Sequence, residues 1–247
     1  FTIYNSTFAL LNQFMQPREI LIKQTHRFNS VLNGFTKDPT LQQYKVFKKL
    51  VKKAVDTELG KKFQFDEILT ANFDIALFRK LVPVYTYESI YEEWWKRAKR
   101  GDINTCWPGK IKYFALSSGT SKGASKYIPV SKQMLKTIKK TSLKQIVSIS
   151  GMGLPNKLFG GQVLMVGGST KLEEKNGRFF GDMSGISMAH AMPDWFYKNY
   201  YKPGYSISEL TTWKARVDAI VKQAKEWDIT VICGMPNWVY YLIEKII

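Results

Sequence analysis

The sequence predicts an α/β fold in which helices flank a mixed or largely parallel sheet. After about residue 100, short apolar runs typical of strands alternate with longer segments of helical periodicity. Glycines punctuate the middle of the chain as turns. Before residue 100, apolar residues recur at helical spacing instead. We therefore expect a mostly helical part over residues 1–100 and an α/β part over residues 101–247.

Two segments of the helical part have clear patterns. The first opens at Asp38-Pro39-Thr40, a good helix start, and its apolar residues share one face. The second ends in a basic cluster that complements the helix dipole. Its apolar stripe consists of Tyr87, Ile90, Tyr91, Trp94, Trp95 and Ala98. Both apolar stripes predict packing in the core. The lysines that stand between the apolar residues of the first segment predict a solvated helix face.

Strand-like runs in the α/β part lie at Tyr113–Leu116, Tyr127–Val130, Gln162–Val166 and Ile229–Cys233. Helical patterns at Ser131–Ile149 and Ser208–Trp227 separate them, and a last helix opens near Pro236 and runs to Ile247. Strands alternating with helices indicate a layered α/β arrangement.

Composition narrows the function classes. The 247 residues carry a net charge of +17, which suits a binder of nucleic acid, an anionic surface or an anionic substrate, or a merely solvated basic surface. Cys106 and Cys233 stand far apart, and His26 and His190 are the only histidines, so neither a disulfide framework nor a metal site is expected. No apolar run reaches the ~20 residues of a membrane span. A reduced, cytoplasmic setting is the expectation.

One loop combines features of a phosphate site. Between two strand-like runs stands Ser117-Ser118-Gly119-Thr120-Ser121-Lys122-Gly123, followed by Lys126. Gly119 and Gly123 let the backbone approach an anion, the hydroxyls can donate to its oxygens, and Lys126 can neutralise charge. The chain matches neither G-x-x-x-x-G-K-[ST] nor G-x-G-x-x-G at this loop. The residues therefore predict a phosphate cradle of another type.

The loop resembles the phosphate-binding signature of the adenylate-forming superfamily, and within it the acyl-acid–amido synthetases, known from plants as auxin-conjugating enzymes. Flanking stretches agree: Thr57–Lys62, Val82–Ile90, and Ile232-Cys233-Gly234-Met235-Pro236-Asn237-Trp238, which resembles the family's G-x-P-x-W segment. The resemblance covers roughly residues 55–247. It implies that residues 1–247 are the N-terminal adenylation domain of such an enzyme, with the fold of that domain.

The resemblance implies a two-step reaction: a carboxylic acid reacts with ATP to give an acyl-adenylate, and the amine of an amino acid then forms the amide. It implies phosphate contacts by Ser117, Ser118, Gly119, Thr120, Ser121, Gly123 and Lys126. It also suggests that Ser142, Gln145, Met235 and Trp238 line an acyl pocket. Gln145 occurs where some family members place an arginine that binds the substrate carboxylate. The sequence therefore does not identify the acyl substrate.

The family's Mg²⁺-binding glutamate, its ribose-binding acid and its C-terminal lid are expected beyond Ile247. We therefore expect ATP and Mg²⁺ to be required, but assign no catalytic or metal-binding residue to this chain and expect no turnover by it alone. His190 stands among small apolar residues, where a histidine is more often a hydrogen-bonded structural residue than a catalytic one. Asp182 and the pair Glu173-Glu174 have no second acid at a telling spacing, so we assign none of these residues a catalytic role.

Two alternatives stay open. A basic module could bind nucleic acid or an anionic surface, although the aromatic stripes favour packing over base stacking. A non-catalytic nucleotide-binding relative would keep the loop without the reaction. The expected partners of the leading hypothesis are ATP, a small carboxylic acid and an amino acid, with no nucleic acid.

Overall fold

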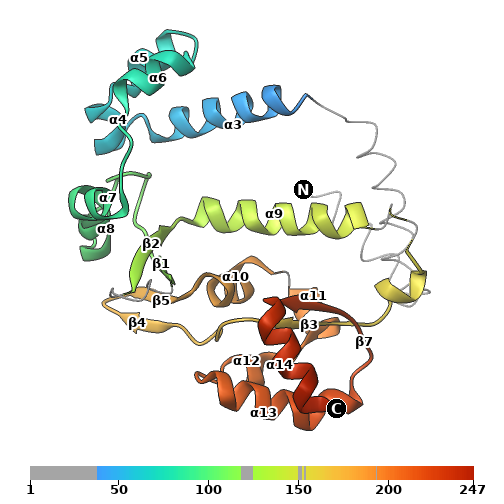
Figure 1. Cartoon of the computed structure of the whole chain (residues 1–247). Helices are drawn as coiled ribbons and strands as arrows, with labels where there is room; N and C mark the ends of the chain where they lie inside the picture. The colour runs from blue at the N-terminus through green and yellow to red at the C-terminus, as the bar shows by residue number, and fades with distance from the viewer. Residues whose placement is uncertain (1–37, 118–124, 150–151, 153, 193) are drawn as a thin grey trace. The chain divides into compact units, whose positions relative to one another are not determined.

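A computed structural model describes residues 38–117, 125–149, 152, 154–192 and 194–247 (Figure 1). The chain forms two compact units. We call Lys37–Leu135 with Leu172–Ile186 the loop unit, and Lys136–Lys171 with Ser187–Ile247 the C-terminal unit. Two boundaries between them fall inside helices α9 (Lys132–Ile149) and α10 (Met183–Ala191), and a third lies between Lys171 and Leu172. Each unit is described by itself.

The loop unit begins with a helical region, as predicted for the part of residues 1–100 that the structure describes. Its helices are α3 (Pro39–Ala54), α4 (Glu58–Lys62), α5 (Phe65–Thr70), α6 (Ile75–Leu81), α7 (Tyr87–Ile90), the π-helical η1 (Tyr91–Trp95) and α8 (Lys96–Arg100). Asp38 caps α3 by accepting a 2.9 Å hydrogen bond from Thr40 N–H, so the predicted helix start is confirmed. Val51, Phe65, Ile68 and Trp94 belong to the buried core of this region.

The stripe from Tyr87 to Ala98 is not one regular helix, contrary to the expectation. Thr86 and Ser89 form a capping box that starts α7, and the chain then widens into η1 before α8. A π-helical turn holds more residues than an α-helical one, so apolar residues at α-helical spacing no longer share one face. Only Trp94 and Ala98 of the stripe are buried.

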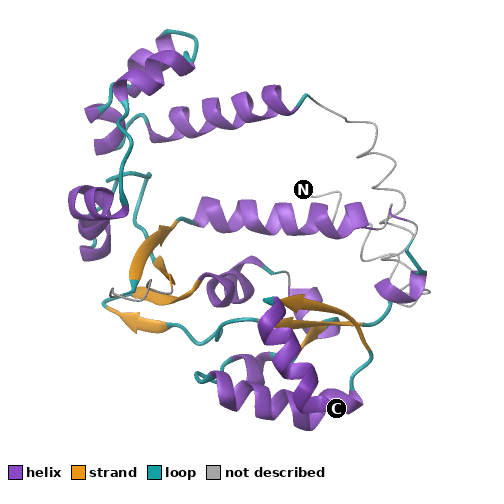
Figure 2. Ribbon diagram, viewed as in Figure 1, coloured by secondary structure: helices purple, strands orange, loops and turns teal. Residues whose placement is uncertain are grey.

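A four-stranded mixed sheet completes the loop unit, in the order β2-β1-β5-β4. Its strands are labelled in Figure 1 and drawn in orange in Figure 2. Its strands are β1 (Tyr113–Ser117), β2 (Lys126–Val130), β4 (Glu173–Lys175) and β5 (Arg178–Asp182). β1 pairs antiparallel with β2 and parallel with β5. Phe114 and Phe180, neighbours in that parallel register, stack with ring centroids 5.5 Å apart in the core.

Strands β4 and β5 were not predicted, although a signal was present. Asn176 and Gly177 both have positive φ, 52° and 68°, and join the two strands as a tight hairpin. Asn-Gly is a strong sequence signal for such turns. The polar sequence of β4 conceals it, because β4 is an exposed edge strand without apolar alternation.

The C-terminal unit contains a three-stranded parallel sheet between helices. The sheet order is β6 (Tyr201–Lys202), β3 (Gln162–Val166), β7 (Ile229–Gly234). The helices are η3 (Asn156–Phe159), α11 (Asp194–Asn199), α12 (Tyr205–Ser208), α13 (Trp213–Gln223), η4 (Ala224–Glu226) and α14 (Pro236–Ile246).

Successive residues of β3 point to opposite faces of this sheet. Leu164 and Val166 pack in one core with α13 and α14. Val163 and Met165 pack in another with α10 and α11. Strands β3 and β7 match their predicted bounds to within one residue. The predicted α/β fold with parallel and mixed sheets and flanking helices is confirmed.

The helix predicted over residues 208–227 is shorter than expected. Ser208 ends α12, and α13 begins only after Thr212, whose side chain accepts a 3.2 Å hydrogen bond from Ala215 N–H. A threonine N-cap has extended backbone angles, so the helix cannot continue backwards through it. No helix of the described residues is long and apolar enough to cross a membrane.

Candidate functional site

The predicted phosphate loop joins two paired strands. β1 ends at Ser117 and β2 starts at Lys126, and these two residues face each other in the antiparallel register. The structure therefore brings together the first and last of the predicted phosphate-binding residues. The others lie outside the described residues: Ser118, Gly119, Thr120, Ser121 and Gly123.

The side chain of Lys126 is held between a carboxylate and an aromatic ring. Its Nζ lies 3.6 Å from Glu88 Oε1 and 4.7 Å from the centroid of the Tyr87 ring. Both members of the ion pair are exposed, so solvent and salt screen the attraction. A hydrogen bond from its own backbone N–H and the charge of Lys126 hold the pKa of the Glu88 carboxyl below its usual range. The side chain of Lys126, the first residue of β2, is thus only weakly held.

Tyr87 also holds the backbone of the hairpin. The backbone N–H of Tyr127 donates a 2.8 Å hydrogen bond to Tyr87 Oη. Tyr91 lies between the two rings, with centroids 5.5 Å from Tyr87 and 6.5 Å from Tyr127. Burial raises the pKa of the Tyr87 hydroxyl, which therefore stays protonated at neutral pH. The first residues of β2 are fixed to the α7–η1 segment.

A second cation strengthens this anchor. Lys99 Nζ lies 3.2 Å from the centroid of the Tyr127 ring and 5.9 Å from that of Phe180. A cation close to a ring face is attracted by its quadrupole. Tyr87, Tyr91, Tyr127 and Lys99 therefore form one group, which we call the hairpin anchor.

The sequence did not indicate the hairpin anchor. Tyr87 and Tyr91 read as core residues of a helical stripe, and Glu88 stood only in a stretch that resembled the family. The run of aromatic residues ending in a basic cluster was the available signal. Its meaning depends on β2 lying against η1, which local periodicity does not reveal.

The carboxyl ends of β1 and β5 meet beside the loop. In the parallel register Leu116 stands opposite Asp182, one residue before Ser117. Ligands of α/β folds bind at such strand ends. Asp182 is therefore a carboxylate next to the start of the loop, a placement that the sequence alone did not give.

Ser142 and Gln145 lie on α9, in the part that belongs to the C-terminal unit. Ser142 is half-buried and Gln145 is exposed. The described contacts include none that assigns either residue a ligand-binding role, so their place in an acyl pocket stays a prediction.

The G-x-P-x-W segment forms the junction between β7 and α14. A Cβ on Gly234 would lie 2.8 Å from both the Cβ and the carbonyl oxygen of Val166, so only glycine fits there without movement. Pro236 is the first residue of α14, and the Trp238 ring lies 4.7 Å from that of Trp213. Met235 is left 57% exposed. Gly234 and Trp238 thus have clear packing roles.

No group of three or more His, Cys, Asp or Glu side chains that could hold a metal ion occurs among the residues in the described ranges. His190 lies on α10, where burial lowers the pKa of its imidazole. Neither observation adds a metal centre to the site.

Comparison with known proteins identifies the family. Residues 29–217 match the model of the GH3 family N-terminal domain. No curated protein matches. The fold is similar to the structure titled "AtGH3.15 acyl acid amido synthetase in complex with 2,4-DB", with a TM-score of 0.66 and 20% identity over 87% of this chain. A second structure, "GH3.15 acyl acid amido synthetase", matches with a TM-score of 0.63 and 19% sequence identity, also over 87% of this chain.

The chain spans 37% of the length of each of these two structures. At their low identity the structural matches establish the fold, while the family match covers most of the chain. The family resemblance that the loop and its flanking stretches predicted is therefore confirmed. This chain belongs to the GH3 family and carries its N-terminal domain.

Proposed function

We propose that this chain supplies the ATP-phosphate site, and part of the acyl site, of an enzyme that joins a carboxylic acid to an amino acid. The observation that carries the proposal is the hairpin with Ser117 opposite Lys126, closed by a loop of serine, threonine and glycine. Family membership and the fold of the two acyl acid amido synthetases support it.

The chemistry requires charge neutralisation and positioning. In the first step a carboxylate oxygen attacks the α-phosphorus of ATP, and the bond to pyrophosphate breaks. In the second the amine nitrogen attacks the acyl carbon, the bond to AMP breaks and the amine loses a proton. Hydroxyl and backbone N–H donors of the loop, with the ammonium of Lys126, would hold the leaving pyrophosphate.

The hairpin anchor gives Lys126 a defined starting position. Glu88 is an exposed and screened partner, so a triphosphate with several charges can replace it as the counter-ion. We infer that Lys126 exchanges Glu88 for phosphate when ATP binds. Mg²⁺ would supply further neutralisation of the phosphates. Since the described residues offer no metal-binding group, no step is assigned to it.

The acyl site is proposed from the family resemblance alone. Ser142 and Gln145 are the polar candidates on α9, and Met235 is an exposed candidate at the β7–α14 junction. Trp238 is the least suited of the four, because its ring already packs against Trp213.

The test is ATP binding by this chain, measured by calorimetry on Lys126→Ala and on a matched control, Lys175→Ala. Lys175 is also paired with a glutamate, Glu173 at 2.6 Å, but lies on β4 at the opposite edge of the same sheet. Loss of a charge-assisted contact should weaken ATP binding by Lys126→Ala about tenfold, while Lys175→Ala binds normally.

Equal affinities of the two variants would contradict the assignment of Lys126. Displacement of ATP by single-stranded DNA, with a steep dependence on salt, would favour the basic-module alternative. In the natural full-length protein, we expect ATP–pyrophosphate exchange that depends on an added carboxylic acid. Its absence across a broad panel of acids, with ATP still bound, would favour a non-catalytic relative.

A further inference from the structure

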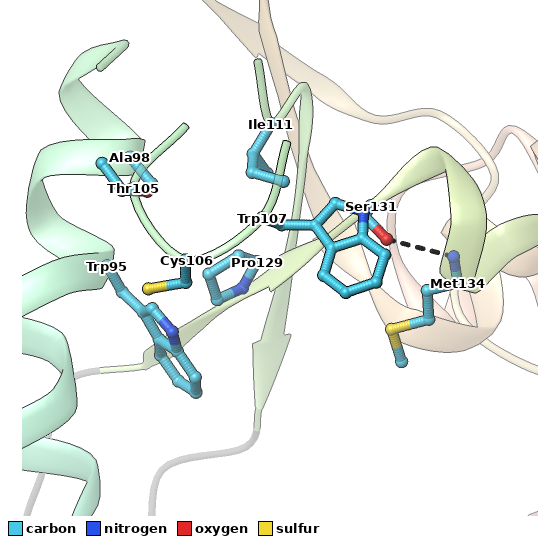
Figure 3. A pocket seen from close by; sticks show the side chains of 9 residues that line it. All are labelled: Trp95, Ala98, Thr105, Cys106, Trp107, Ile111, Pro129, Ser131 and Met134. Carbon is cyan, nitrogen blue, oxygen red and sulfur yellow. Dashed lines mark hydrogen bonds between the residues drawn. The ribbon is translucent and has the colours of Figure 1, made fainter. Parts of the chain in front are cut away.

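A small cavity opens in the loop unit beside strand β2 (Figure 3). Its volume is about 200 Å³. The indole rings of Trp95 and Trp107 line it together with Pro129, Ile111 and Met134. Figure 3 shows the two indoles with Pro129 drawn between them in this view. Two large aromatic surfaces and an aliphatic remainder suit a flat apolar guest.

The polar groups at the cavity are few and uncharged. They are Thr105, Cys106 and Ser131, and no charged side chain belongs to the lining. Ser131 Oγ accepts a 3.1 Å hydrogen bond from Met134 N–H, so the Ser131 hydroxyl acts as the acceptor and does not donate its hydrogen in this bond. Burial raises the pKa of the Cys106 thiol to about 12, so it is neutral as well. A charged guest would therefore find no counter-ion among the lining residues to offset its partial loss of hydration.

The size of the cavity narrows the class of ligand further. Pockets for drug-sized ligands occupy about 300–1,000 Å³, whereas a dry cavity of about 150 Å³ can hold benzene. The cavity is therefore too small for ATP or an acyl-adenylate. It fits one aromatic ring with a short substituent.

The cavity is separate from the residues proposed for the enzymatic site. None of its lining residues belongs to the phosphate loop or to the acyl-site candidates. It nevertheless touches the same elements, because Pro129 lies on β2, Ser131 directly precedes α9 and Met134 belongs to the first turn of α9. Trp95 also contacts the hairpin anchor, with its ring centroid 6.0 Å from that of Tyr87.

From the volume, the two indoles of the lining and the absence of charged lining residues, we infer that this cavity is a binding site for a small, neutral, single-ring aromatic compound. The inference is independent of the proposed ligase activity. A ligand there would contact the strand that returns from the loop and the first turn of the following helix.

The experiment is titration of the isotope-labelled chain with toluene, followed by amide and indole NMR signals. We expect saturable shifts of the Met134 amide and of the Trp95 and Trp107 indole N–H groups, with a millimolar or tighter dissociation constant. Signals of α13 and β7 in the C-terminal unit should stay unchanged. No saturable shift at these three positions up to the solubility limit of toluene would overturn the inference.

A charged analogue and a pair of variants sharpen the test. Benzoate has the same ring with a carboxylate, and binding of benzoate at the cavity as tight as toluene would refute the neutral class. Met134 is 39% exposed, so Met134→Phe can fill the cavity without overpacking the core, and should weaken toluene binding about tenfold. Met152 is exposed and lies elsewhere, so Met152→Phe should bind toluene normally.

Discussion

The hairpin at β1–β2 and the junction at β7–α14 both carry sequence stretches that resemble motifs of one family, yet contacts of different kinds hold them. At the hairpin, a tyrosine hydroxyl, aromatic rings and two lysines fix the base of the loop. At the junction, a glycine allows two strands to approach closely and a tryptophan packs against another tryptophan at a tilt. The first arrangement leaves a cation at the mouth of a loop, where it can meet a ligand. The second uses its characteristic residues for packing.

The comparison shows that residues of one motif can serve stability while those of another remain available for chemistry. Substitutions at the junction should therefore reduce stability first and ligand binding only as a consequence. Substitutions at the hairpin should change ATP binding with smaller losses of stability.

The largest effect is expected at the junction. Gly234→Val should lower the free energy of unfolding by about 2–3 kcal/mol, because its side chain overlaps the backbone and side chain of Val166. Urea denaturation measures the loss. Met235→Ala is the matched control next in sequence, and should change stability by less than about 0.5 kcal/mol because Met235 is exposed. Similar losses for the two variants would remove the distinction between packing and exposed residues here.

An intermediate effect is expected at the hairpin anchor. Tyr87→Phe keeps the ring but removes the acceptor of the Tyr127 N–H, which should cost about 1 kcal/mol. The same loss of about 1 kcal/mol should accelerate hydrogen exchange of the Tyr127 amide about fivefold. Tyr240→Phe, at a tyrosine 64% exposed, serves as the control. Unchanged exchange at Tyr127 would show that the ring contacts alone hold β2.

The smallest effect is expected for the exposed pair. Glu88→Gln removes the carboxylate that competes with phosphate for Lys126, so ATP affinity should rise about twofold. Weaker ATP binding by this variant would mean that Glu88 positions Lys126 rather than competing for it. Calorimetry at low salt gives the clearest measurement, because salt screens the pair.

The same variant tests the pH dependence. The pKa of Glu88 is lower in the folded chain than its ordinary value, so the hydrogen bond from its own backbone N–H, together with the charge of Lys126, stabilises the fold above that ordinary value. This stabilisation disappears as pH falls through the lowered pKa. When the pH is lowered from neutral to acid, thermal unfolding should therefore show a slightly smaller decrease in stability for Glu88→Gln than for the unchanged chain. An identical pH profile would contradict a role of the Glu88 carboxylate in stability.

The sequence by itself determined the strands with continuous apolar runs, the cap of α3, the alternation of strands and helices and the family. The strands and the cap depend on local signals, a short apolar run bounded by turn residues and an Asp before a proline. The family depended on the loop together with the stretches on either side of it. Strand β4 and the break before α13 are also local, but their signals at Asn176-Gly177 and Thr212 were outweighed by the surrounding pattern.

Only the tertiary structure decided what the aromatic residues contact. Whether Tyr87 belongs to a core or to an anchor depends on where β2 lies, and hydrogen bonds across 40 residues leave no periodic trace in the sequence. The same holds for Trp95 and Trp107, whose cavity exists because Pro129 and Met134 meet them from later in the chain. Long-range pairing places these groups, because the identity of a side chain fixes its chemistry but not its neighbours.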